Sequence, residues 1–215
     1  MAITSGLTNG GDGASRSRPA SYSLSGAVLR LATILCLASA FAGCMPADMS
    51  KAQRDVVLTG AELVPFGFAS PTGAIDENWE SRRWFDGSRE IEYTYETQHE
   101  SEQMPLYLSV SVSWETSRPD AIGVYGATLL GFKLGLAAES IESHELTDSC
   151  KYGDRCTLLL LTRDRRPLGN QFVLQAGSSV YIVQIFGLYF DEPEVWHEMI
   201  VPKVTALKNL GIGES

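Results

Sequence analysis

The sequence predicts an α+β protein, a mainly antiparallel β-sheet with a long central helix and a C-terminal helix packed on it. Three observations lead to this fold class. Apolar and polar residues alternate over residues 88–97 and 106–114, which is typical of strands with one buried face. A long apolar stretch follows over residues 118–139 and predicts a helix. An acidic turn containing Pro193 then opens a last helical pattern, which Gly211 ends.

Residues 1–43 have the anatomy of an export signal. The first part, residues 1–26, is rich in Gly, Ser, Ala and Thr and lacks apolar periodicity. Behind Arg30, Leu31 to Ala42 form a 12-residue apolar run, which has the length of a signal-peptide core and is too short to span a bilayer. The run ends in Phe41-Ala42-Gly43-Cys44, which resembles the lipobox of bacterial lipoproteins.

This resemblance implies cleavage before Cys44, diacylglycerol on its thiol and acylation of the new amino terminus. We therefore expect a lipid-anchored protein of the cell envelope, whose partners are the membrane, through the anchor, and an envelope protein. Because Met45 rather than Asp follows the cysteine, the resemblance implies the outer membrane, facing the periplasm, if the source is Gram-negative. An ordinary signal peptide with an incidental cysteine, or a buried N-terminal helix, are the alternatives.

The chain divides into three parts on this basis. Residues 1–43 are a signal peptide that is removed. Residues 44–60 are the lipidated cysteine and a short polar segment, which predicts a flexible tether. Residues 61–211 form a single α+β domain, consistent with the length of the chain.

Four strands are expected before the central helix. They are Glu62–Phe68, Trp79–Phe85, Ser88–Thr97 and Leu106–Trp114. The first ends in the turn cluster at residues 70–73, the second stops at Asp86-Gly87, and the polar segment at residues 99–105 is a hairpin loop.

The segment over residues 118–139 is expected to be a helix with Pro119 in its first turn and an acid near its positive dipole end. Four small residues recur at intervals of four and predict a smooth face on the sheet: Gly123, Ala127, Gly131 and Gly135. A transmembrane helix packed through these small residues is the alternative. Lys133 and the strand patterns on both sides favour the packed helix.

Four more strands and a helix follow. The strands are expected at Ile141–Leu146, Cys156–Thr162, Gln171–Gln175 and Val180–Phe190. A charged loop is expected at residues 163–170, and a hairpin turn at residues 176–179. The last helix carries Pro202, which should kink it.

Cys150 and Cys156 are predicted to form a disulfide. Cys36 would leave with the signal peptide and Cys44 would carry lipid, so these two thiols remain in an oxidising compartment. The turn at Gly153-Asp154 between them suits closure. Two buried free thiols or a redox-active pair are the alternatives.

The order of elements over roughly residues 60–210 resembles the PsbP-like fold of bacterial lipoproteins of the DcrB and LpqN kind. Residues 67–73 resemble an opening aromatic strand that runs into a Pro/Gly turn before a tryptophan, here Trp79. The segment from Ser179 to Leu207 resembles the final strand, acidic-proline turn and closing helix of that family. The resemblance implies an accessory, assembly or binding protein rather than an enzyme.

The sequence contains no motif that identifies a catalytic, cofactor-binding or metal-binding residue. His197-Glu198 begins like a zinc-protease helix, but Val201 stands where the second histidine would be. Glu142 and His144 share one face of a predicted strand and are too few for a metal site. Basic residues gather in one loop and read as solvated or as a docking patch: Arg163, Arg165 and Arg166. The tryptophans are expected in the core: Trp79, Trp84, Trp114 and Trp196.

The charge distribution excludes one class of partner. Residues 1–43 hold three basic residues and one acidic residue, whereas the remainder holds 14 basic and 25 acidic residues, a net charge of −11. An acidic body repels nucleic acid, which is excluded as a partner. A binding or assembly module at the cell envelope is the leading hypothesis. An envelope enzyme of unrecognised type, with Glu142 and His144 as acid and base, and a subunit of a larger envelope complex are the alternatives.

Overall fold

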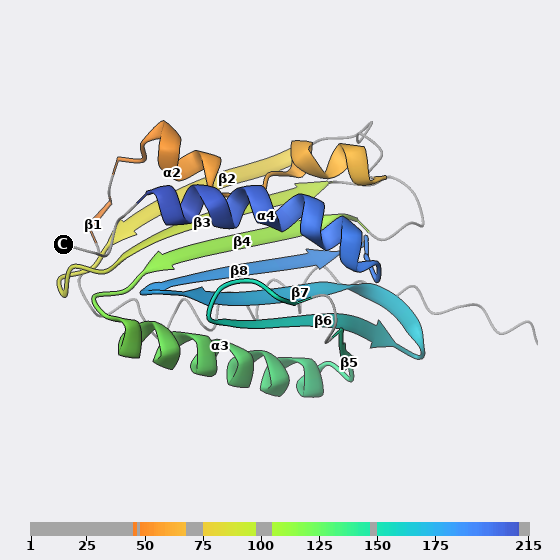
Figure 1. The fold of residues 1–215 in the computed structure, drawn as a ribbon. Helices are drawn as coiled ribbons and strands as arrows, with labels where there is room; N and C mark the ends of the chain where they lie inside the picture. The colour runs from red at the N-terminus through yellow and green to blue at the C-terminus, as the bar shows by residue number, and fades with distance from the viewer. Residues whose placement is uncertain (1–44, 47, 68–74, 98–104, 147–149, 211–215) are drawn as a thin grey trace, which may run out of the picture.

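The structure is a computed structural model that describes residues 45–46, 48–67, 75–97, 105–146 and 150–210 (Figure 1). The predicted signal peptide, Cys44, the turn at residues 70–73 and nearly all of the hairpin loop at residues 99–105 lie outside the described residues, as does Gly211.

Within the described residues, eight strands form one antiparallel sheet in the order β1-β2-β3-β4-β8-β7-β6-β5. The strands are β1 (Met45–Pro46), β2 (Ile75–Arg83), β3 (Arg89–Thr97), β4 (Tyr107–Trp114), β5 (Glu142–Glu145), β6 (Arg155–Arg163), β7 (Arg166–Ala176) and β8 (Ser179–Phe186). Helix α4 (Pro193–Asn209) covers one face, and helix α3 (Arg118–Ala138) lies against the other face near the β5–β6 edge (Figure 1). The fold class is the predicted one.

The main core lies between the sheet and α4. The alternation predicted for β3 and β4 is confirmed, since every second side chain is buried in each strand. Trp196 of α4 is fully buried and stacks on Phe172 of β7, with ring centroids 5.7 Å apart. Strand β7 is buried continuously from Leu168 to Gln175 because helices cover both of its faces.

The segment before β2 belongs to this core. Helix α2 (Lys51–Asp55) is followed by Val56, Val57 and Leu58, which are 0%, 0% and 1% exposed. The Leu58 amide donates to the hydroxyl of Tyr181 at 3.1 Å. The prediction of a flexible tether is therefore wrong for residues 48–60. The apolar residues after α2 belong to the same buried cluster as residues of the sheet and α4.

The predicted strand at Glu62–Phe68 is wrong, because Gly60–Phe66 form a 3-10 helix, η1. Thr59 and Glu62 form a capping box at its start, and Gly67 ends it with a φ of 95°. A Cβ on Gly60 would lie 2.6 Å from the ring of Tyr95, so the backbone approaches the sheet more closely than other residues allow. Local capping chemistry here outweighs a short apolar pattern.

Helix α3 packs on β7 and β8 through Ala121, Tyr125 and Thr128. The predicted small-residue face is wrong for Gly123 and Ala127, which are both exposed. Residues at intervals of four drift around a helix of 3.6 residues per turn, so the sheet-facing side passes through other positions.

By length and composition α3 could cross a membrane. It contains an 18-residue window of mean hydropathy 1.5, of which 28% is buried. A helix that packs on a sheet can satisfy the same criterion. Its contacts with β7 and β8 agree with the packed helix that the sequence favoured.

The connections around β6 differ in part from expectation. A charged loop was predicted over residues 163–170, but Asp164 and Arg165 alone make the turn, with φ of 51° and 63°. Positive φ at both central residues is typical of the two-residue type I′ hairpin turn, whose twist matches that of the flanking strands. Cys150, before β6, and Cys156, in the first part of β6, form the predicted disulfide, with Cα atoms 5.5 Å apart.

Candidate functional site

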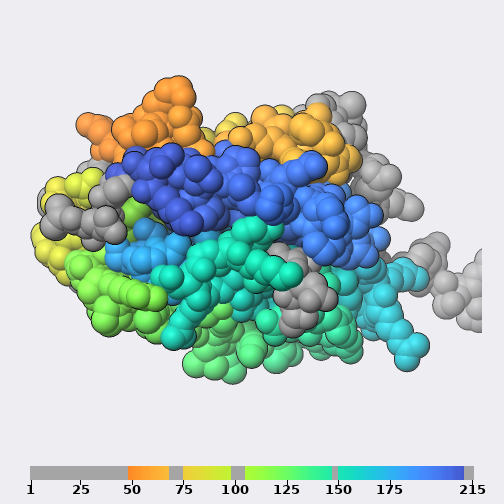
Figure 2. Space-filling model, in the orientation of Figure 1, coloured from red at the N-terminus to blue at the C-terminus, as the bar shows by residue number. Residues whose placement is uncertain are grey.

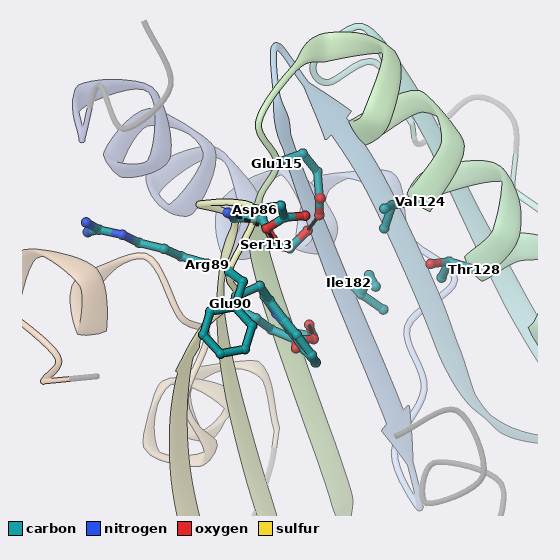
Figure 3. A pocket seen from close by; sticks show the side chains of 12 residues that line it. Asp86, Arg89, Glu90, Ser113, Glu115, Val124, Thr128 and Ile182 are labelled. Atoms are coloured by element: carbon teal, nitrogen blue, oxygen red, sulfur yellow. Dashed lines mark hydrogen bonds between the residues drawn. The ribbon is translucent and has the colours of Figure 1, made fainter. Parts of the chain in front are cut away.

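A pocket of about 600 Å³ opens on the face of the sheet that carries α3 (Figure 3). It lies where the β2–β3 turn, β4, β8 and α3 meet. Its lining residues are Trp84, Phe85, Asp86, Ser88, Arg89, Glu90, Ser111, Ser113, Glu115, Val124, Thr128 and Ile182. Because α3 covers only part of this face, the space beside it stays open.

Three carboxylates line the pocket, each held by a neighbouring hydroxyl. Asp86 accepts hydrogen bonds from the Ser88 amide at 2.9 Å and the Ser88 hydroxyl at 2.7 Å. Glu115 accepts from the Ser113 hydroxyl at 2.6 Å, and Glu90 accepts from Ser111 at 3.2 Å. The site therefore holds fixed negative charge.

The surroundings set the pKa values of two of these groups in opposite directions. Burial raises the pKa of Glu115 above its ordinary value, and the nearby carboxylates of Asp86 and Glu90 add to this effect. The hydrogen bonds from Ser88 lower the pKa of Asp86. A positive group placed beside Glu115 would favour its ionised form.

Arg89 is the basic residue among the lining residues. Figure 3 shows its side chain extending away from Asp86, Ser113 and Glu115. The opposite wall is apolar, since Val124 of α3 and Ile182 of β8 face the space (Figure 3). Trp84 and Phe85 add aromatic surface from the turn. Carboxylates together with aromatic and apolar walls suit an organic cation.

Arg82 lies beside three glutamates, of which Glu90 lines the pocket and Glu80 and Glu92 do not. It contacts Glu80, and its Nη1 lies 3.4 Å from Glu92 and 3.7 Å from Glu90. Burial lowers the pKa of Arg82, but the three glutamates outweigh this effect and raise it. Burial raises the pKa of Glu92. This network leaves Asp86 and Glu115 without an arginine partner among the described residues.

Comparison with family models, curated proteins and solved structures finds no match for this chain.

Glu142 and His144 lie on β5, at the edge of the sheet, where every residue is exposed. The His144 Nε2 is 3.9 Å from the Glu142 carboxylate and 3.4 Å from the Thr162 hydroxyl. The two side chains share a face, as predicted, but they do not line the pocket. Among the described residues, no three His, Cys, Asp or Glu side chains gather as metal ligands.

The other residues considered from the sequence lie apart from the pocket. His197 is exposed on α4, with its Nδ1 3.5 Å from the Tyr152 hydroxyl. Arg163 donates to the Glu139 carbonyl at 3.1 Å, while Arg165 and Arg166 are exposed at the β6–β7 turn. The arginine patch is thus confined to one turn and the end of α3.

The tryptophans are divided between core and surface. Trp114 and Trp196 are buried, at 3% and 0% exposure, as predicted. Trp79 packs on Tyr93 with ring centroids 4.5 Å apart. The core prediction is wrong for Trp84, which is half-buried and lines the pocket. The aromatic pair directly before Asp86-Gly87 is the sequence signal that could have identified this turn as part of a candidate site.

Proposed function

We propose that this chain is a lipid-anchored binding module of the cell envelope, attached through Cys44. The 12-residue apolar run behind Arg30 and the lipobox-like ending support this proposal. So does the acidic body, which needs an anchor rather than a basic face to stay on a membrane. In a Gram-negative source it would face the periplasm from the outer membrane. Membership of the PsbP-like family is proposed from the order of the elements.

The pocket is the observation that carries a binding function. Its Glu115, Asp86 and Glu90 carboxylates face a space with apolar and aromatic walls. We propose that it takes an amine on an aliphatic stem, the chemistry of a lysine side chain on an envelope protein. The stem would lie along Val124 and Ile182, and the ammonium would meet the carboxylates.

Anchoring is tested first. Mass spectrometry of the detergent-extracted protein should show a mature chain that begins at an acylated Cys44. A Cys44→Ala chain should move to the soluble fraction, because two or three acyl chains give stable attachment. An unmodified Cys44, or a Cys44→Ala chain that stays with the membranes, would contradict the anchor.

Binding is tested with two peptides that differ in one residue, lysine or its uncharged isostere norleucine. The lysine peptide should bind more tightly, and Glu115→Gln should weaken it about tenfold, since a hydrogen bond to a charged group contributes about 1.5 kcal/mol. Glu145→Gln, on the exposed strand β5 outside the pocket, is the matched control. Equal binding of the two peptides would rule out recognition of the amine.

A further inference from the structure

The described start of the chain fixes where the proposed anchor meets the domain. In β1, Met45 pairs with Arg83 and Pro46 pairs with Arg82 in antiparallel register. Cys44 directly precedes Met45 in the sequence, so β1 is the described segment nearest to the proposed anchor. Since Arg83 is the last residue of β2, Met45 lies beside the start of the β2–β3 turn.

That turn projects an aromatic side chain into solvent. Phe85 is 76% exposed, the highest value among the large hydrophobic side chains of the described residues. The half-buried Trp84 is its neighbour. Aromatic side chains of this kind are enriched where proteins meet the headgroup region of a bilayer.

The turn is held in a defined shape. The Trp84 amide donates to the Ser88 carbonyl at 2.9 Å, and the Gly87 amide donates to the Trp84 carbonyl at 3.0 Å. Gly87 has a φ of 97°, which favours glycine. The exposure of Phe85 is therefore imposed by the turn and is not the chance position of a loose side chain.

The strand ends beside the turn carry basic residues, whereas the body of the protein is acidic. Arg83 and Arg89 face each other in the register of β2 and β3. In the part of the chain that the structure describes, neither has a carboxylate within ion-pair distance. The one acid of the turn, Asp86, is bonded to Ser88. Two unpaired guanidinium groups suit the phosphates of lipid headgroups.

We propose that the β2–β3 turn, residues 84–88, is a second membrane contact that places Phe85 and Trp84 in the bilayer interface beside the lipid on Cys44. The proposal rests on the anchoring proposed above. The occupant is a phospholipid surface, because β1, the strand that follows the proposed anchor in the sequence, lies beside this turn. Figure 2 shows the yellow hairpin at one end of the molecule, and Figure 1 shows β1 at the same end.

Two contacts fix an orientation where one would leave the domain free to turn. The sheet would stand with its strands directed at the membrane and its β2–β3 end down. The pocket, which Trp84 and Phe85 also line, would then open close to the bilayer surface. A lysine recognised there would come from a segment of an envelope protein that runs near the membrane.

Quenching by brominated lipid tests the contact. The full chain is incorporated in vesicles of phosphatidylcholine and phosphatidylglycerol whose acyl chains carry bromine near the headgroup end. The signal from Trp84 is the difference between the wild-type chain and Trp84→Phe. We expect Trp84 to be quenched, and Phe85→Ser to lose most of this quenching. Tyr189→Ser is the matched control, since Tyr189 is 45% exposed and follows β8 at the opposite end of the sheet.

A second arm separates this proposal from the anchor. In a full-length variant, a hexahistidine segment replaces residues 38–43 and serine replaces Cys44, so that nickel-chelating lipid holds the same end of the domain. Quenching of Trp84 in this variant supports the contact even if the natural chain proves unacylated. If the natural chain is acylated and Trp84 is quenched neither in it nor in the hexahistidine variant, the membrane contact is overturned and the anchor stands. Thermal unfolding of Phe85→Ser at the wild-type temperature shows that the variant is folded.

Discussion

At the scale of single residues, Glu115 links the stability of the domain to its proposed binding. Its pKa is raised mainly by burial, so the folded state favours the protonated form. The favourable contribution of this group to folding is present below the pKa of an unfolded glutamate and is lost as pH rises through the raised folded value. Ionised Glu115 therefore destabilises the free protein at neutral pH, and a bound amine would offset that cost.

We expect Glu115→Gln to be more stable than the wild-type chain at neutral pH and equal to it below about pH 4, where glutamates are protonated in both states. Urea unfolding at the two pH values checks this. Affinity for the lysine peptide should fall as pH decreases through the raised pKa. A Glu115→Gln variant that is less stable at neutral pH would contradict the assigned cause.

At the scale of elements, the sequence predicts best where one pattern acts alone. Strands β3 and β4 were predicted from alternation because each has one covered face. The η1 segment was mistaken for a strand because its Thr59–Glu62 capping box acts over three residues, which a short apolar run conceals. The pocket could not be predicted, since Asp86, Glu90 and Glu115 come from separate elements whose approach depends on sheet register.

Helix α3 offers a test of its observed orientation. A Cβ on Gly123 would meet no atom within 4 Å, so the glycine has no packing role. Gly123→Ala should stabilise the domain by up to about 1 kcal/mol, the difference in helix propensity. Gly169→Ala is the contrasting change, because its Cβ would overlap the Ile185 carbonyl. A loss of stability in Gly123→Ala, measured by urea unfolding, would mean that this face is packed after all.

The disulfide holds the start of β6. Its loop spans a sequence separation of 6, so the chain-entropy model gives about 2–2.5 kcal/mol of stabilisation. The double change Cys150→Ser and Cys156→Ser should lower the free energy of unfolding by about this amount. Adding reductant to the wild-type protein is the control and should give a similar loss. No change under either condition would mean that the native protein carries free thiols.

At the scale of the whole molecule, Lys203 joins α4 to the N-terminal part of the described chain. It is 7% exposed, and its Nζ donates to the Asp55 carbonyl at 3.2 Å and to Glu62 Oε1 at 2.7 Å. These partners lie 148 and 141 residues away in the sequence. The C-terminal helix therefore holds the N-terminal segment against the sheet.

Removing either partner should have unequal effects. Glu62→Ala leaves a buried ammonium without its carboxylate and should cost on the order of 2–3 kcal/mol. Lys203→Met keeps the apolar stem and leaves Glu62, whose side chain is 45% exposed, to water. It should cost about 1 kcal/mol or less. Equilibrium unfolding of the two variants gives the order, and a reversed order would contradict the role assigned to the lysine.

If the chain is exported as proposed, the packing of its N-terminal segment against α4 also sets the sequence of events during export. An exported chain crosses the inner membrane with its N-terminus first, so Val56, Val57 and Leu58 emerge long before the helix that covers them. Contacts this distant in sequence form late. We therefore expect the domain to stay unfolded until α4 has crossed. An early, half-translocated chain would present these residues to periplasmic chaperones and proteases, and folding would begin only when translocation is nearly complete.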